Sequence, residues 1–390
     1  MTEKPLAGIR VLEIGGYISL PYATALLCSL GAEVVKVEKP GTGEDFRRQM
    51  DDKSPYFVQF NTGKRSLAVD LKNPVGVEFV KSLVPHFDVV LENLRPGKTA
   101  ALGLGPEVCR ALKPDLVYGS VSGFGSGGPL EQRPAYDSIG QSYGGLYSLL
   151  SDAGSNQLAG GASADLVTAL CTVTGVLAAL CGRAATGRGS HVETSMMESI
   201  SALTIDAITL YCDSGVTPTR QSRHPQGQVF CLKTSSGVYV TVHLSSSQKF
   251  FEALCEAVGR PDLATDPRFA RYNARQEHYF ELVGILETEF VKEPAEYWEA
   301  RLTEYDVPFA PVLSIAEYVN HPQTEWLDLI AKDREDTVLV RPPWKFDGER
   351  PHRVPDAPRV GEDTRDLAEE VLDADRIEHL LETGVLYSDK

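Results

Sequence analysis

Short apolar runs alternate with helix-like segments along the first 121 residues, and this alternation constrains the fold more than any other feature. Residues 9–14 (IRVLEI) and 33–38 (EVVKVE) have the length and composition of buried strands. Between them, Pro21 suits the first turn of a helix over residues 22–30, which ends at Gly31. Similar patterns predict strands at 66–71, 88–91 and 116–121 and a helix at 75–84. Short strands that alternate with helices predict a parallel, doubly wound α/β sheet.

The second half of the chain has the pattern of a smaller α+β unit. Residues 214–228 are rich in Pro, Arg, Gln and Ser and indicate a linker. Strand-like runs at 229–234 and 238–243 flank Ser235-Ser236-Gly237, which indicates a β-hairpin. Helical patterns follow at 248–258, 275–290 and 295–304, and in the tail at 364–372 and 374–382. We therefore expect a second domain and a return of the chain to helical structure at its end.

Composition argues against several classes of protein. A chain of 390 residues can form two domains, and a formal charge of −16 argues against a binder of nucleic acid or of anionic membranes. The N-terminus lacks the apolar core of a signal peptide, and the longest uncharged apolar run, 166–182, is short for a membrane span. The seven cysteines form no CxxC pair or Cys/His ligand run. We expect a cytoplasmic protein with reduced thiols and no metal.

The turn after the first predicted strand resembles a dinucleotide site only in part. Glu38 ends the second strand where a ribose-binding acid would stand. The turn itself reads Gly15-Gly16-Tyr17-Ile18-Ser19 and lacks the G-x-G-x-x-G pattern, so its backbone could not approach a pyrophosphate closely. We therefore expect neither a nicotinamide nor a flavin cofactor.

Basic residues recur near the expected carboxyl ends of the first three strands, where open α/β sheets bind ligands. They are Lys36, Lys39, Lys64, Arg65 and Lys72. Taken singly they have the character of solvated charges, but their recurrence favours an anionic, phosphate-bearing ligand. The glycine-rich stretch 122–129 (SGFGSGGP) is either a tight turn or a backbone-lined ligand edge.

Asp165 is the only ionisable residue in the apolar stretch 160–180 (GGASADLVTALCTVTGVLAAL). One interpretation is a helix cap or first-turn acid, which the helix dipole stabilises. The other is a nucleophile, because Ser163 could cap the helix and leave the Asp165 carboxylate facing a cavity. The histidines form no HExxH motif, and the chain has no nucleophile elbow to provide another catalytic group.

Motifs along nearly the whole chain resemble, in the expected order, the class III coenzyme A transferases, a family that includes α-methylacyl-CoA racemases. They are PLAGIRVLEIGG, LGAEVVKVEKPGTGEDFR, NTGKRSLAVDLKNPVG, DVVLENLRPGKTAALGLG, SGFGSGGP, PAYDSIGQ, DLVTA, RAATGRGSHVETSM, HPQGQVF, GRPDLATDPRF, VPFAPV and PRVGEDT. The resemblance implies a large Rossmann-like parallel-sheet domain built from both chain ends, a small α+β domain, and an interlocked homodimer. The implied boundaries are 1–213 for the large domain, 214–228 for a linker, 229–313 for the small domain, 314–360 for the returning linker and 361–390 for the C-terminal helices.

The resemblance also implies chemistry. Asp165 aligns with the aspartate that attacks an acyl-CoA thioester, so we expect an acyl-CoA:carboxylate CoA-transferase acting through an aspartyl mixed anhydride. The alternatives are a racemase, which moves an α-proton, and an inactive CoA-binding paralogue. In the racemases a histidine precedes the aspartate that corresponds to Asp137, whereas this chain has Tyr136. A tyrosine is a poor proton shuttle at neutral pH, and this favours the transferase.

The expected substrates are an acyl-CoA and a small carboxylic acid, with coenzyme A as the ligand. The implied coenzyme A contacts are Gly16, Tyr17, Ile18, Lys39, Val69, Lys72, Asn93, Leu94, Lys98 and Leu102. Ala101 replaces a family arginine, for which Lys98 or Arg95 could substitute. The cations that could meet a substrate carboxylate, or be simply solvated, are Arg47, Arg48, Arg220 and Arg223. A shortened loop at 226–228 could close the site, and the donor and acceptor stay open.

Overall fold

The computed structural model describes residues 4–48, 50, 54–152, 154–332, 338–352 and 356–389. The chain forms two compact units. The larger one comprises Met1–Tyr147, Leu158–Thr204 and Gln323–Lys390, and the smaller one comprises Ser148–Gln157 and Ile205–Pro322.

The larger unit contains a seven-stranded sheet in the order β12-β3-β2-β1-β4-β5-β6. Its strands are β1 (Arg10–Ile14), β2 (Glu33–Glu38), β3 (Arg65–Val69), β4 (Val89–Glu92), β5 (Val117–Ser122), β6 (His191–Ser195) and β12 (Leu386–Tyr387). The first six pair in parallel, so the predicted doubly wound sheet is confirmed. The chain leaves β1 in one direction across the sheet and returns to β4 on the other side, and ligands bind where such a reversal opens a crevice.

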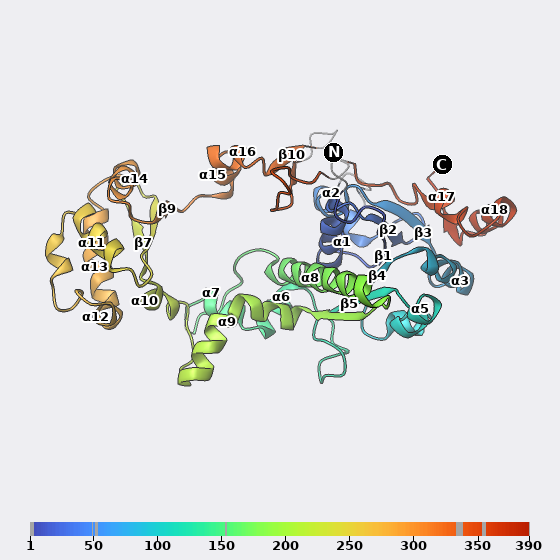
Figure 1. Ribbon diagram of the computed structural model, residues 1–390, viewed down its shortest axis with the longest axis horizontal. Helices are drawn as coiled ribbons and strands as arrows, with labels where there is room; N and C mark the ends of the chain where they lie inside the picture. The colour runs from blue at the N-terminus through green and yellow to red at the C-terminus, as the bar shows by residue number, and fades with distance from the viewer. Residues whose placement is uncertain are drawn as a thin grey trace. The chain divides into compact units, whose positions relative to one another are not determined.

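Both ends of the chain contribute to this sheet. Strand β12 pairs antiparallel with β3, with Leu386 opposite Val69. Helices α17 (Thr364–Ala368) and α18 (Ala374–Glu382) precede β12 and lie beside the N-terminal strands (Figure 1). A parallel sheet has two faces to bury, and the C-terminal helices supply part of the cover that the first 200 residues lack.

Two hydrophobic clusters cover the two faces of the sheet. On one face, α1 (Ser19–Ser29) and α8 (Ser163–Thr186) pack on alternate residues of β1, β2, β4 and β5. On the other face, α3 (Pro74–Leu83), α5 (Pro106–Leu112), α17 and α18 pack on the intervening residues. Because side chains alternate across a strand, the nearly continuous apolar runs of the sequence fill both clusters.

Within the described residues, α8 is the helix whose length and apolar composition would suffice to cross a membrane. In the structure it packs against α1, β5 and β6, and its first turn packs against α6 (Asp137–Tyr143). A smaller cluster joins the start of α8 to α7 (Leu146–Leu150) and α9 (Met196–Ser214). This packing accounts for the apolar composition of α8.

Shorter elements complete the larger unit. They are the 3-10 turns η1 (Asp45–Arg47) and η3 (Val84–His86), the helices α2 (Pro55–Asn61), α4 (Lys98–Ala101) and α16 (Pro322–Trp326), and the hairpin β10 (Ile330–Lys332) and β11 (Val338–Val340). All seven cysteines lie in the described part of the chain, and each is a free thiol.

The smaller unit contains the predicted hairpin, β7 (Val229–Lys233) and β8 (Tyr239–His243), to which β9 (Phe309–Pro311) adds a third strand. The helices are α10 (Arg223–Gly227), α11 (Gln248–Ala257), α12 (Tyr272–Glu277), α13 (Tyr279–Phe290), α14 (Ala295–Glu304) and α15 (Ile315–Val319), with the 3-10 turn η4 (Pro261–Ala264). The single helix predicted at 275–290 is wrong. His278 leaves the helical conformation between α12 and α13, and only α13 places its apolar residues in the core.

Candidate active site

The site forms where the chain reverses direction between β1 and β4. The turn after β1 is fixed by Asn93, which follows β4: the Gly16 amide donates to Asn93 Oδ1 (3.1 Å), and Asn93 Nδ2 donates to the Gly16 carbonyl (2.9 Å). A Cβ on Gly15 would lie 1.9 Å from Asn93 Oδ1, so glycine is required there. The implied contacts Gly16, Tyr17, Asn93 and Leu94 are thus neighbours at the crevice of the sheet.

Asp137 caps the helix that carries Asp165. Asp137 Oδ1 accepts hydrogen bonds from the backbone amides of Ala164 (2.8 Å) and Asp165 (3.2 Å), and Gln141 donates to Asp137 Oδ2 (2.6 Å). The idea that Ser163 caps this helix is wrong, because α8 begins at Ser163 and no side chain of its own caps it. A carboxylate from another helix satisfies these amides, which leaves the Asp165 carboxylate free of the capping role.

Asp165 is buried, with 8% of its surface exposed. Burial and the negative charge of Asp137 raise the pKa of the Asp165 carboxyl to about 7, against the opposing effect of a hydrogen bond with the Ser19 hydroxyl. Ser19 begins α1, directly after the turn that Asn93 holds. The apolar cluster at the start of α8 and the first turn of α1 therefore both adjoin this carboxyl group.

Two tyrosines pack against each other in the same region. The rings of Tyr17 and Tyr136 meet edge to face with centroids 5.5 Å apart. A hydrogen bond with Tyr136, together with burial, raises the pKa of Tyr17 to about 12, so it is a neutral hydrogen-bond donor at neutral pH. Tyr17 has a φ of 69°, a left-handed conformation that costs a residue other than glycine about 1 kcal/mol.

Lys39 and Tyr17 share a partner. Lys39 Nζ donates to Asp45 Oδ1 (2.8 Å), and the Tyr17 hydroxyl donates to Asp45 Oδ2 (3.4 Å). Lys39 is exposed just beyond β2, and Lys72 is exposed beyond β3, so both lie at carboxyl ends of strands as predicted.

Three of the five basic residues expected at these strand ends pair with carboxylates of the protein elsewhere. Lys36 and Lys64 are buried and both bind Glu13, at 2.7 and 2.8 Å. Arg65 lies at the amino end of β3 and pairs with Glu33 and Asp363. For these three the prediction of a ligand-facing charge is wrong, because Lys36 and Lys64 are buried with a partner of opposite sign and Arg65 lies at the other end of its strand.

Glu38 is not available to a ribose. Its oxygens accept hydrogen bonds from Arg47 (2.8 and 2.6 Å), Ser66 Oγ (2.7 Å) and the Glu44 amide (3.0 Å). This network closes the loop after β2 on itself.

The remaining implied contacts have different environments. Val69 has its side chain in the core, and Leu94 and Leu102 pack at the edge of that same cluster. Lys98 begins α4, and Ile18 precedes α1. The glycine-rich stretch 122–129 contains a turn closed by the Gly125 amide, which donates to Ser122 Oγ (3.0 Å).

The candidate substrate-binding arginines separate into two groups. Arg47 pairs with Glu38, Arg220 with Asp152 and Arg223 with Asp206. Arg48 has no carboxylate partner among the residues that the structure describes, and its guanidinium lies over Phe46 (5.1 Å) and Tyr56 (5.0 Å). Phe46 in turn contacts Tyr17, with ring centroids 5.9 Å apart.

In the smaller unit, Gln228 of the 226–228 loop is buried and accepts a hydrogen bond from Arg275.

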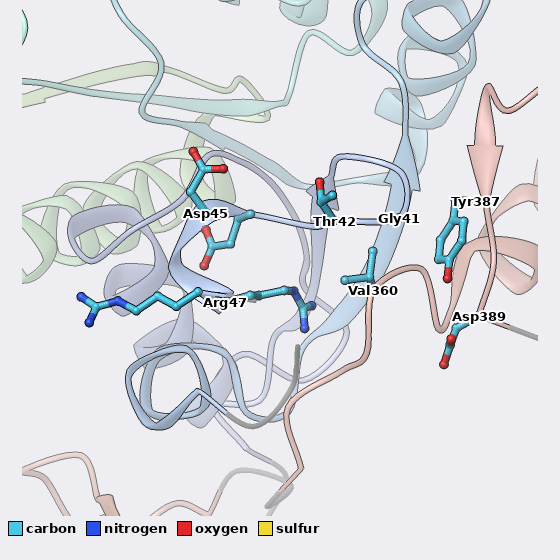
Figure 2. Close-up of a pocket in the computed structure, with 9 residues that line it drawn as sticks. Gly41, Thr42, Asp45, Arg47, Val360, Tyr387 and Asp389 are labelled. Carbon is cyan, nitrogen blue, oxygen red and sulfur yellow. The ribbon is translucent and has the colours of Figure 1, made fainter. Parts of the chain in front are cut away.

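A cavity of about 710 Å³ adjoins this region. Gly41, Thr42, Asp45 and Arg47 of the segment after β2 line it on one side, and Val360, Tyr387 and Asp389 of the C-terminal segment line it on the other (Figure 2). Glu44 and Arg48 complete the lining. Through Asp45 the cavity borders both Tyr17 and Lys39.

No group of three or more His, Cys, Asp or Glu side chains that could hold a metal occurs in the part of the chain that the structure describes.

Three residues of the site were not predicted. Ser19 bonds to Asp165, Glu44 accepts the Tyr17 amide (3.2 Å), and Glu92 accepts the Leu94 amide (3.0 Å) with its pKa raised by burial to about 7. Ser19 could have been found as the first helical residue after the turn. Glu44 and Glu92 have ordinary local patterns, and only the folded sheet shows what they touch.

Comparison with known proteins identifies the family. The model of CoA-transferase family III matches residues 6–364. The chain is 32% identical to an acetyl-CoA:oxalate CoA-transferase of Acetobacter aceti, over 94% of this chain and 96% of that one. It is 30% identical to a succinyl-CoA:glutarate CoA-transferase of Mus musculus, over 98% and 90% of the two chains.

Solved structures agree with the sequence relatives. A hypothetical protein of Mycobacterium tuberculosis superposes with a TM-score of 0.85 at 29% identity, over 94% of this chain and 99% of that one. A CAIB/BAIF family protein of Brucella suis superposes with a TM-score of 0.81 at 30% identity, over the same shares of the two chains. The chain therefore belongs to CoA-transferase family III.

Proposed function

We propose that this protein is an acyl-CoA:carboxylate CoA-transferase in which Asp165 is the nucleophile. The observation that carries the proposal is the capping of α8 by Asp137. Because another carboxylate satisfies the first amides of α8, the buried Asp165 carboxyl is free to react. Acyl-CoA would lie along the carboxyl ends of the strands, past Lys39, Lys72 and Asn93, with its thioester at Asp165.

The reaction would pass through anhydrides. The Asp165 carboxylate attacks the thioester carbonyl, the C–S bond breaks, and CoA leaves as the thiolate. The acceptor carboxylate then attacks the acyl carbon of this anhydride and releases Asp165. Finally the thiolate attacks the acceptor carbonyl of the new anhydride, which yields the new thioester and the free donor acid.

The surroundings of Asp165 suit this sequence. Water would hydrolyse an anhydride, and the apolar cluster at the start of α8 limits its access. The Tyr136 hydroxyl can donate a hydrogen bond of the kind that stabilises an oxyanion. Tyrosine in place of the racemase histidine leaves no imidazole at this position to carry an α-proton.

The experiment compares wild type with Asp165→Ala and Asp165→Asn on a panel of acyl-CoA donors and acids. We expect exchange by wild type and a loss of about 10³-fold or more in both variants. Hydroxylamine should trap an aspartyl hydroxamate at residue 165, detectable by mass spectrometry, in wild type alone. Bound CoA without exchange would indicate the inactive paralogue. Exchange of an α-proton with solvent deuterium, without CoA transfer, would indicate the racemase.

We further propose that the acceptor is a small dicarboxylic acid. The relatives described above are named for oxalate and glutarate, both of which are dicarboxylates. A second carboxylate needs a cation, and Arg48 is the one of the four arginine candidates without a carboxylate partner in the described residues. Arg48→Ala should lower kcat/KM for the dicarboxylate about tenfold or more and leave a monocarboxylate of equal length within threefold. Equal losses for both acids would exclude this role, and Arg220→Ala is the matched control.

We also propose a cytoplasmic homodimer whose two chains interlock. Exposed apolar side chains on α8 and α9 support an interface; they are Leu166, Leu170, Leu203, Ile205, Ile208 and Tyr211. Sedimentation should give the mass of two chains at nanomolar concentration. Differently tagged dimers should not exchange subunits without unfolding, because interlocked chains cannot separate while folded.

A further inference from the structure

We propose that Glu44 is a positioning residue for the reaction: it holds the turn between β1 and α1 in the conformation that presents Tyr17 and Ser19 to Asp165. The inference rests on the proposed function for its kinetic readout. Its structural readout, the state of the Tyr17 amide, does not depend on any activity.

Glu44 touches the turn at its most constrained point. Its Oε2 accepts the hydrogen bond of the Tyr17 amide at 3.2 Å, and Tyr17 is in the left-handed conformation with a φ of 69°. A residue other than glycine keeps such a conformation only where its surroundings impose it. Asn93 fixes Gly16 from one side, and Glu44 fixes Tyr17 from the other.

The packing between Glu44 and the turn is close enough to specify the sequence. A Cβ added to Gly16 would lie 2.3 Å from Glu44 Oε2, and no other group stands within 3 Å of it. Gly16 has no need of glycine for its φ, since its backbone is outside the left-handed region. A side chain at residue 16 would therefore displace the Glu44 carboxylate.

A buried set of charges holds Glu44 in place. Lys36 Nζ lies 3.0 Å from Glu44 Oε2, 2.7 Å from Glu13 Oε1 and 3.1 Å from the carbonyl of Gly15 in the same turn. Lys64 binds the other oxygen of Glu13. Two carboxylates thus face two ammonium groups in the interior, and Glu44 is the carboxylate that reaches the turn.

Two contacts carry this geometry to the reacting group. The Tyr17 ring packs on Tyr136, and the side chain of Ser19, two residues further on, interacts with the Asp165 carboxyl. If the turn relaxes at Tyr17, both groups shift relative to the Asp165 carboxyl. A displacement of about 1 Å between reacting groups lowers kcat strongly.

The test compares Glu44→Ala, Glu44→Gln and Glu13→Gln. The amide oxygen of glutamine can still accept the Tyr17 hydrogen bond, so Glu44→Gln should keep kcat within threefold of wild type. Glu44→Ala should lower kcat by about tenfold or more, with KM for acyl-CoA changed less than kcat. Glu13→Gln weakens the charges that hold Glu44 but keeps Glu44 itself, so it should lower Tm and lower kcat by less than Glu44→Ala does.

Hydrogen exchange of the segment 15–22 supplies the readout that needs no turnover. The Tyr17 amide should exchange at least tenfold faster in Glu44→Ala than in wild type, and at nearly the wild-type rate in Glu44→Gln. If wild type transfers no CoA, the proposed function fails while this measurement still tests Glu44. Unchanged exchange and kcat in Glu44→Ala would overturn the inference.

A second substitution exploits the close contact at Gly16. Gly16→Ala should lower kcat and raise exchange at Tyr17, because its methyl group displaces the Glu44 carboxylate. In the Glu44→Ala background the methyl group has room, so adding Gly16→Ala should cost less than threefold more. Independent, multiplying losses would show that the two residues do not act through their contact, and would count against the inference.

Discussion

Asp165 and Asp137 are two carboxylates in one site with separate environments. Asp137 accepts two backbone amides and a glutamine side chain, which stabilise its charge. Asp165 is buried beside that charge, and its pKa rises to about 7. A nucleophile must be ionised, so the free enzyme gains its reactive form as the pH increases through about 7.

This difference predicts the pH dependence of kcat/KM for acyl-CoA. In wild type kcat/KM should rise with pH and be half-maximal near pH 7, because protonated Asp165 cannot attack. Asp137→Asn removes the neighbouring negative charge but keeps an acceptor oxygen for the cap. The midpoint should then fall by on the order of one pH unit. A midpoint that stays near pH 7 in this variant would assign the titration to another group. Asp45→Asn is the control, because it removes a carboxylate that binds the Tyr17 hydroxyl rather than one that adjoins Asp165.

Single residues show where the sequence was informative. Gly16, Tyr17, Asn93 and Leu94, which the family resemblance implied as coenzyme A contacts, lie together after β1 and β4. Lys36 and Lys64 were misassigned, because a lysine inside a strand and one before it have the same local pattern whether the side chain faces solvent or a buried carboxylate. The partner that decides, Glu13, is far away in the sequence and is found only after the strands pair.

At the scale of elements, the start of α8 depends on a different helix. Asp137, in the first turn of α6, supplies the acceptor that α8 lacks at its own N-cap, Ala162. The pair α6 and α8 is therefore joined by a polar contact, next to the apolar cluster that joins α8 to α7 and α9.

Removing this cap should loosen the first turn of α8. Asp137→Ala should lower the free energy of unfolding by about 1–2 kcal/mol, and Asp137→Asn by less, because asparagine still accepts an amide hydrogen bond. Hydrogen exchange over residues 163–168 should accelerate in Asp137→Ala more than over 176–182 in the same helix. Uniform acceleration along α8 would point to a loss of packing instead.

Most elements could be predicted from periodicity. The strands near 9–14, 33–38 and 116–121 lie within two residues of their predicted bounds, because apolar β-branched runs between turns have few alternatives. The break at His278 was not predicted, since residues 275–278 (RQEH) contain no glycine or proline to mark the end of a helix. The strands β9 and β12 are too short to give a pattern and exist only through their partners β8 and β3.

At the scale of the whole molecule, the chain ends meet at β3. Leu386 is buried and completes the cluster under α3 and α18. Ending the chain after Gly384 should lower the free energy of unfolding by roughly 2–5 kcal/mol, because it removes Val385 and Leu386 from the core. Ending it after Ser388 removes the exposed Arg359–Asp389 pair and should cost less than about 1 kcal/mol. Thermal unfolding distinguishes the two, and equal Tm values would show that β12 adds nothing.

The place of β12 has a consequence during synthesis. When β3 has left the ribosome, about 300 residues must still be translated before β12, its neighbour at the edge of the sheet, emerges. At 5–20 residues per second this takes roughly 15–60 s, during which the edge of β3 and the face later covered by α17 and α18 are open. The nascent chain thus presents an unpaired strand and an uncovered apolar surface for most of its synthesis. It is during this interval, rather than after release, that a chaperone has most to protect.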